Sequence, residues 1–192
     1  MTKTYLFALA AILFSSLPAH SLAEDQAPDY TTDGLELVDK DRRGEIYADP
    51  GIDWSVYTEI LLERPSVAFR KNWQRDQNRQ QSFKVKAEDM ERIKNGLADQ
   101  FEEVFSEELT ENGGYTMAQA TADNVLRITP HIVDLDVYAP DTRSAGRTSS
   151  YTESAGRMTL KLAMFDSVTG DLIATASHRQ EAPRRGYMQW TT

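Results

Sequence analysis

The residues whose types and spacing most suggest chemistry lie close together in the second half of the chain. His131, Asp134 and Asp136 fall within one short stretch, and Asp141 follows shortly after. An imidazole and several carboxylates are the groups that hold a divalent metal ion or that act as acid and base in hydrolysis. A metal-dependent hydrolase is therefore one candidate function. A solvated outer face of a strand explains the same residues without any site, and that is the interpretation we favour.

The segment that carries these residues, 125–138, is predicted to be one long strand. Its apolar residues change parity, because Leu126, Ile128 and Ile132 occupy even positions while the apolar residues from Val133 onward occupy odd ones. A regular strand cannot bury both sets on one face, since its side chains alternate. We expect either a bulge near Ile132, which would turn the histidine and both aspartates outward together, or burial on both faces.

A basic stretch with aromatic residues among its charges gives a second candidate site. Residues 64–86 carry seven basic residues and one acidic residue, and 70–86 is predicted to be a polar loop. Arg70, Lys71 and Trp73 in this loop would bind an anionic polymer or a lipid head group. Core packing is the alternative for Trp73, and it is the interpretation we favour. The alternative is internal neutralisation, because the following segment, 87–112, carries nine acidic and two basic residues.

A short repeat gives a third candidate. The sequence Ser-Ala-Gly-Arg occurs at 144–147 and again at 154–157. If the two copies face each other across a hairpin, Arg147 and Arg157 would form an anion site, assisted by backbone donors that the glycines permit. Two small-residue turns flanked by solubilising arginines are the alternative interpretation.

The elements that must position these residues follow from periodicity. Apolar residues spaced three and four apart predict one helix over 87–109, ended by Asn112-Gly113-Gly114. Alternating residues over 158–164, a turn over 166–171 and a return segment over 172–176 predict a hairpin. The fold class is therefore α+β, with one long amphipathic helix packed on a mostly antiparallel sheet of about five strands.

The beginning of the chain has the layout of an export signal. Lys3 precedes an apolar run over 5–17, and Ser21-Leu22-Ala23 supplies small residues for cleavage. We predict a signal peptide over 1–23, an extended polar lead-in over 24–44 and a single α+β domain over 45–192. No later stretch is long and apolar enough to span a membrane. The mature protein is expected to be periplasmic or secreted.

Composition narrows the classes of function. The 192 residues contain no cysteine and carry a formal net charge of −9. The absence of cysteine excludes disulfides, cysteine-bound zinc and a lipid anchor on an N-terminal cysteine. The acidic balance argues against a nucleic-acid partner. The chain also lacks a nucleophile elbow, a phosphate loop and a dinucleotide fingerprint, and no cofactor is predicted.

Several stretches taken together resemble a bacterial envelope family known as domain of unknown function 3313. They are Asp33-Gly34-Leu35, Pro50-Gly51 with Trp54 and Tyr57, Phe69 with Trp73, Asp134-Leu135-Asp136, Ala139-Pro140-Asp141, both Ser-Ala-Gly copies, Asp166-Ser167-Val168-Thr169-Gly170 and Gln189-Trp190-Thr191. The resemblance implies a cell-envelope location and a small α+β domain, and it implies no reaction. Similar chains continue past the last of these stretches into a terminal helix. Either the fold is complete without that helix, or an open apolar surface favours a partner or self-association.

From these observations we predict a non-catalytic, exported accessory or binding module. Its expected partner is an envelope protein or an anionic envelope polymer.

Overall fold

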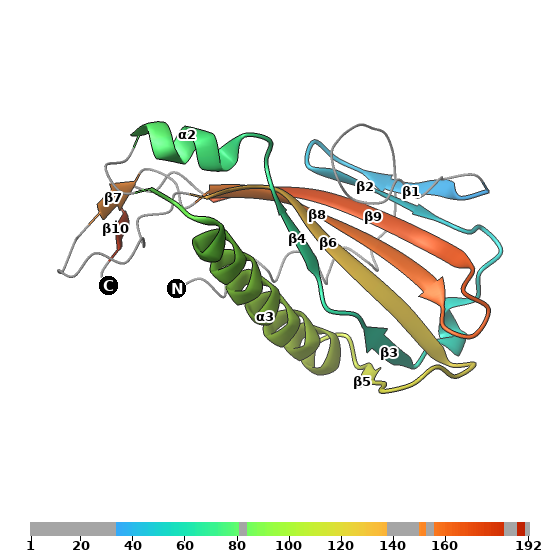
Figure 1. Ribbon diagram of the computed structural model, residues 1–192. Helices are drawn as coiled ribbons and strands as arrows, with labels where there is room; N and C mark the ends of the chain where they lie inside the picture. The colour runs from blue at the N-terminus through green and yellow to red at the C-terminus, as the bar shows by residue number, and fades with distance from the viewer. Residues whose placement is uncertain (1–33, 81–83, 138–149, 153–155, 183–187, 191–192) are drawn as a thin grey trace.

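The computed structural model describes residues 34–80, 84–137, 150–152, 156–182 and 188–190. Its main feature is a mixed sheet of eight strands in the order β1-β2-β9-β8-β6-β3-β5, with β4 also paired to β6 (Figure 1). A separate pair is formed by β7 and β10. The strands are β1 (Glu36–Lys40), β2 (Gly44–Ala48), β3 (Glu59–Leu62), β4 (Ser66–Phe69), β5 (Thr116–Met117), β6 (Val125–Val137), β7 (Ser150–Thr152), β8 (Gly156–Asp166), β9 (Leu172–Glu181) and β10 (Met188–Trp190). The helices are the short η3 (Trp54–Val56), α2 (Trp73–Gln80) and α3 (Ala87–Glu111).

The predicted α+β class is confirmed, but the expected number of strands is too low. The pairs β1–β2, β2–β9, β9–β8 and β8–β6 are antiparallel, whereas β3 and β4 run parallel to β6 and β5 runs parallel to β3. The strands missing from the prediction include β1 and β2, which lie at one edge of the sheet. Each has only five residues, which gives little alternation to recognise in a sequence.

The long helix is α3, as predicted. At its start the amide of Lys86 donates to Oδ2 of Asp89 at 2.9 Å, which satisfies a backbone donor that the helix leaves free. Its apolar face packs on the sheet through Phe101, Phe105 and Leu109, which belong to the main core cluster with residues of β6 and β8. The helix therefore covers the β4 and β6 side of the sheet, while β1 and β2 lie away from it (Figure 1).

The long strand β6 contains an irregularity, slightly later than predicted. Its register with β8 shifts between Val133 and Asp136, and Asp134 has a φ of 53°. Ile132 and Val133 are nevertheless both buried. Both predicted solutions therefore occur, because β6 is buried on both faces just before it kinks at Asp134. The switch of apolar residues from even to odd positions indicated an irregularity in this strand. Only the pairing of β6 with β8 shows at which residue it occurs.

The segment predicted as a polar loop over 70–86 contains a helix, α2, and this part of the prediction is wrong. Only one large apolar residue of α2, Trp73, points into the protein, so the sequence shows no apolar stripe. The helix is held by tertiary contacts instead. The side chains of Gln74 and Asn78 both donate to the carbonyl of Val85, at 2.9 and 3.1 Å.

The described part of the predicted lead-in contains strand β1, which pairs with β2. Within the described residues, β1 is the first strand of the sheet, and it lies inside the predicted lead-in. The predicted signal peptide, 1–23, lies outside the described residues. None of the helices in the described segments has both the length and the apolar character needed to cross a bilayer.

Candidate functional site

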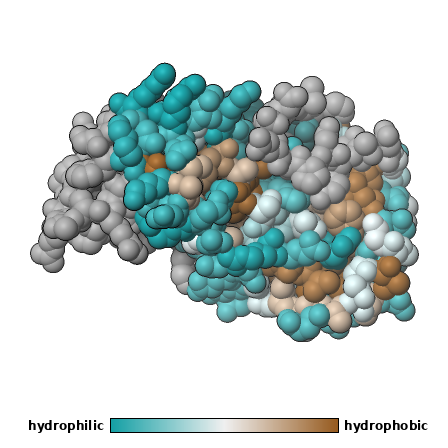
Figure 2. Space-filling model, viewed as in Figure 1, coloured by the Kyte–Doolittle hydropathy of each residue, from teal (hydrophilic) through white to brown (hydrophobic). Residues whose placement is uncertain are grey.

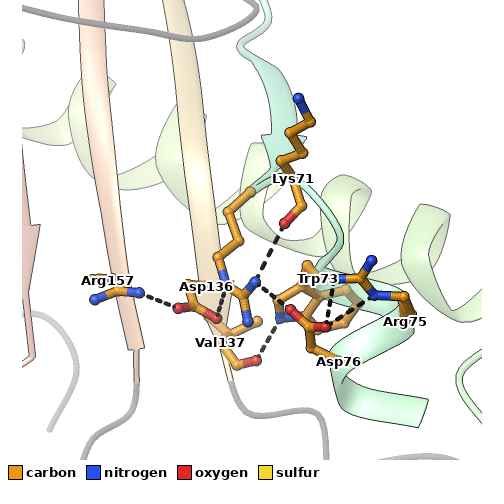
Figure 3. Close-up of polar contacts among 8 residues, drawn as sticks. Lys71, Trp73, Arg75, Asp76, Asp136, Val137 and Arg157 are labelled. Atoms are coloured by element: carbon orange, nitrogen blue, oxygen red, sulfur yellow. Dashed lines mark hydrogen bonds and ion pairs between the residues drawn. The ribbon is translucent and has the colours of Figure 1, made fainter. Parts of the chain in front are cut away.

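Five charged residues of alternating sign form one continuous chain at the end of the sheet next to α2 (Figure 3). Arg157 lies 2.7 Å from Oδ2 of Asp136, whose Oδ1 lies 2.8 Å from Nε of Arg70. Nη1 of Arg70 donates to Asp76 at 2.8 Å, and Asp76 also accepts from Arg75 at 3.2 Å. We call these five residues the ion-pair chain. It joins β8, β6, the end of β4 and α2.

Local backbone geometry brings the first pair of this chain together. Arg157 is the register partner of Asp136, and Gly156 is the partner of Val137. Gly156 has a φ of 131°, and a Cβ there would lie 2.6 Å from the carbonyl oxygen of Asp136. Only glycine allows β8 to approach the kinked end of β6 this closely. The second Ser-Ala-Gly-Arg copy thus has a structural role in its last two residues.

Trp73, a candidate binding residue for which packing was the favoured interpretation, is an anchor of α2. It is only 1% exposed, and its indole N–H donates to the carbonyl of Val137 at 2.9 Å. Its ring stacks on Phe69 with centroids 4.0 Å apart. A buried aromatic ring with a satisfied N–H contributes packing and orientation, and it offers no face to a ligand.

The electrostatics favour the charged forms of Arg70 and Asp76 at the centre of the ion-pair chain. Hydrogen bonds to Asp76 and then to Asp136 raise the pKa of Arg70, and the bond from Arg70 lowers the pKa of Asp76. An arginine–carboxylate pair that stays ionised transfers no proton near neutral pH. The arrangement can instead position anions. The side chains at its two ends, Arg157 and Arg75, are 45% and 55% exposed and have further N–H donors.

The residues of the predicted metal or acid–base site do not converge. His131 is 8% exposed, and its Nδ1 lies 2.7 Å from the hydroxyl of Ser66 on β4. Burial lowers the pKa of His131, and the charge of Lys161 acts in the same direction. Asp136 belongs to the ion-pair chain, whereas Asp134 lies at the kink of β6. Within the described segments no group of three or more such side chains is placed to hold a metal ion.

The remaining predicted site residues divide into two kinds. Asp141 and Arg147 lie outside the described residues, so the paired-turn anion site is described only at Arg157. Lys71 is exposed, and its carbonyl accepts from Arg70 at 3.3 Å. Arg64 agrees with the alternative that the acidic helix neutralises the basic stretch, because it lies 2.6 Å from Asp99 and 3.3 Å from Glu102 of α3.

Two residues of the site lacked a clear signal in the sequence. Asp76 is the acidic residue that links α2 to Arg70, and it stood out only as the one negative charge in a basic run. Arg79 is exposed and lies four residues after Arg75, so both project from the same face of α2. Figure 2 shows hydrophilic residues over α2 and along α3, with apolar residues visible between the two helices. We call Lys71, Arg75, Arg79 and Arg157 the cationic surface.

The fold and site define a small α+β domain with a charged surface at one end of its sheet. The family model described as protein of unknown function (DUF3313) matches residues 24–189, and the chain belongs to that family. The predicted resemblance is therefore confirmed.

Comparison with curated proteins gives no significant match. Two solved structures with some similarity are dodecamers of PelC from Paraburkholderia phytofirmans. One is a single-residue variant with 10% identity and a TM-score of 0.37, and the other has 8% identity and a TM-score of 0.30. In each case 74% of this chain and 83% of the other are covered.

Proposed function

We propose that this protein is a non-catalytic binding module of the bacterial cell envelope, and that its cationic surface binds an anionic envelope polymer. The observation that carries the proposal is the geometry of the ion-pair chain. Asp136 and Asp76 are each shared by two arginines, so Arg75 and Arg157 are fixed at the surface without being fully neutralised. Fixed guanidinium groups bind carboxylates and phosphates with little loss of side-chain freedom.

The contacts of the chemically capable groups support a non-catalytic role. His131 is buried against Ser66, and Asp136 lies between two arginines. Both arrangements stabilise the junction of β4, β6 and β8. A general base needs a lone pair within reach of its substrate, whereas both carboxylate oxygens of Asp136 face guanidinium groups.

Export is the second part of the proposal. It is supported by the signal-like layout of residues 1–23 and by the family match, which begins at residue 24. Mass spectrometry of the N-terminal peptide, isolated from the envelope fraction of cells, is the direct measurement. We expect the peptide to begin at Glu24. A peptide that begins at Met1 in all of the recovered protein would contradict this part.

The polymer proposal is tested with alginate, a polyuronate, against neutral dextran. We expect the purified protein to bind alginate and not dextran, and we expect the affinity to fall at least about tenfold between about 0.05 M and 0.3 M salt, because exposed charges are screened. Replacing Lys71, Arg75 and Arg79 together with glutamine is expected to remove most of the binding.

The matched control removes the same charge elsewhere. Arg42, Arg43 and Lys94 lie outside the cationic surface, and their replacement with glutamine changes the net charge equally. If both triple variants lose binding to the same degree, net charge explains the result and the cationic surface is rejected. Binding that does not respond to salt also rejects it.

A protein partner is the other outcome that the experiments must separate. Cross-linking in the cell followed by purification from envelope extract is expected to recover glycan or lipid polymer with the wild-type protein. Recovery of one enriched protein, unaffected by the change at Lys71, Arg75 and Arg79, would replace the polymer by an accessory role. Recovery of only the chain itself would indicate self-association.

A further inference from the structure

A separate hollow lies toward the β1 edge of the sheet, between β1, β2, β9 and β8. Its volume is about 140 Å³. Its floor is apolar and is formed by Ile46, Leu160, Leu162 and Ala176. Ile46 pairs with Ala176 and Ala176 pairs with Leu162, so these three side chains lie in one row on one face of the sheet.

The hollow exists because two small residues, Gly44 and Ala176, lie beside larger residues on the neighbouring strands. The next row contains Gly44, His178 and Leu160, and Gly44 supplies no side chain. A Cβ on Gly44 would overlap the carbonyl of Ser177, so this position excludes larger residues. Leu160 and Leu162 belong to the main core cluster, and the hollow is therefore an open margin of that core.

The rim of the hollow is acidic. Asp39, Asp41 and Glu45 line it together with His178. Burial opposes ionisation of Asp41, but the amides of Arg43 and Gly44 donate to its Oδ1 at 2.6 and 2.9 Å and lower its pKa. Burial lowers the pKa of His178, which keeps its ring neutral near pH 7.

Two cations are paired with these carboxylates. Nζ of Lys40 lies 3.5 Å from Glu45, and Nε of Arg43 lies 3.8 Å from Asp41. Asp39 is half-buried and also lines the hollow. Glu45 alternates with Ile46 along β2, so its carboxylate and the paired Lys40 face away from the floor. The floor is therefore bordered by the carboxylates of Asp39 and Asp41, with Arg43 as the cation beside Asp41.

We propose that this hollow binds a small organic cation, with its ammonium group at Asp39 and its apolar part over Ile46, Leu162 and Ala176. Ligand sites in proteins combine an apolar lining with a few polar groups that fix orientation. An apolar cavity of about 150 Å³ holds benzene, so this hollow accommodates about six carbon atoms. Neither the cationic surface nor the polymer proposal bears on this site.

The probe is n-hexylammonium, with n-hexanol and n-hexanoate as controls of equal apolar length. Titration of the purified protein, followed by amide chemical shifts, is expected to show shifts at Ile46, Ala176 and His178. We expect hexylammonium to bind at least about fivefold more tightly than hexanol, because the carboxylate adds a charge-assisted contact. Hexanoate is expected to bind more weakly than either.

Asp39→Asn is expected to reduce the affinity for hexylammonium at least about fivefold and to leave hexanol unchanged. Asp171→Asn removes the same charge from the β8–β9 turn and should change neither. Ala176→Leu fills the hollow and should remove binding of both probes. The proposal is overturned if hexylammonium and hexanol bind equally, if Asp39→Asn has no effect, or if the shifts map to other residues. Asp39→Asn keeps the test decisive if Ala176→Leu does not fold.

Discussion

The ion-pair chain and the hollow under β1 and β2 place charges in two different ways. In the ion-pair chain, two carboxylates are shared among three arginines and tie α2 to β6 and β8. At the hollow, Asp39 and Asp41 border an apolar floor, and Nε of Arg43 lies 3.8 Å from Asp41. The ion-pair chain stabilises the structure and leaves an arginine at each of its ends. The hollow instead has aspartates beside an apolar floor.

This difference shows why charge alone does not locate a site. Arg70 looked like a ligand-binding cation in the sequence, yet two carboxylates hold it. Asp39 did not stand out in the sequence, yet it borders an open hollow. What matters is whether the structure already supplies a counter-charge with good geometry. The predictions below test this contrast, from the largest expected effect to the smallest.

Loss of the anchor beneath the ion-pair chain should have the largest effect. Trp73→Ala removes a side chain that is 1% exposed, together with its hydrogen bond to Val137. We expect the free energy of unfolding to fall by about 3–5 kcal/mol. Urea unfolding followed by circular dichroism measures it. Trp54→Ala is the control, because Trp54 is 37% exposed and should cost far less. Equal losses for the two variants would show that α2 is not anchored in this way.

On the side of the hollow, the corresponding change is Gly44→Ala. The added Cβ would overlap the carbonyl of Ser177, and separating β2 from β9 should cost about 1–3 kcal/mol. Gly96→Ala in α3 is the matched control, since nothing lies within 4 Å of its added Cβ. It should stabilise the protein by up to about 1 kcal/mol, because alanine favours helix. Thermal unfolding of both variants distinguishes the two signs, and stabilisation by Gly44→Ala would contradict the close approach.

Breaking the ion-pair chain at its centre should have a moderate effect. Asp136→Asn leaves Arg70 and Arg157 without their shared carboxylate, and we expect a loss of about 1–2 kcal/mol, since the group is only partly exposed. A double-mutant cycle with Arg157→Gln isolates the coupling between the two residues. Asp134→Asn, at the kink nearby, is the control and should show no coupling to Arg157. A coupling energy near zero between Asp136 and Arg157 would mean that their ion pair does not stabilise the protein, and that backbone pairing alone joins β6 to β8 here.

Acidification should have the smallest effect. Burial lowers the pKa of both His131 and His178 below the ordinary value of 6.5. The folded state therefore favours the neutral ring. The contribution of each ring to stability is complete above pH 6.5 and is lost as the pH falls through and below that value. The urea midpoint of the wild-type protein should decrease below about pH 6.5, less steeply in His131→Gln or His178→Gln. An unchanged slope in both variants would assign the effect to other groups.

The clearest periodic patterns predicted the largest elements. The apolar residues of α3 recur every three or four positions and those of β8 every two, and each pattern continues for several repeats. Burial of one continuous face fixes such elements whatever the rest of the chain does. The short strands β1 and β2 and the helix α2 could not be predicted in the same way. Each is stabilised by pairing or by single contacts with residues far away in the sequence.

The sequence by itself therefore determined the α+β class, the long helix, the central strands and the excess of cations near α2. Only the tertiary structure decided which of those cations are paired, because Arg70, Asp136 and Arg157 come from three different strands or strand ends. The kink at Asp134 and the close approach at Gly156 bring them together. Coulomb energy depends on separation in space, and chain order does not specify that separation until the backbone is folded.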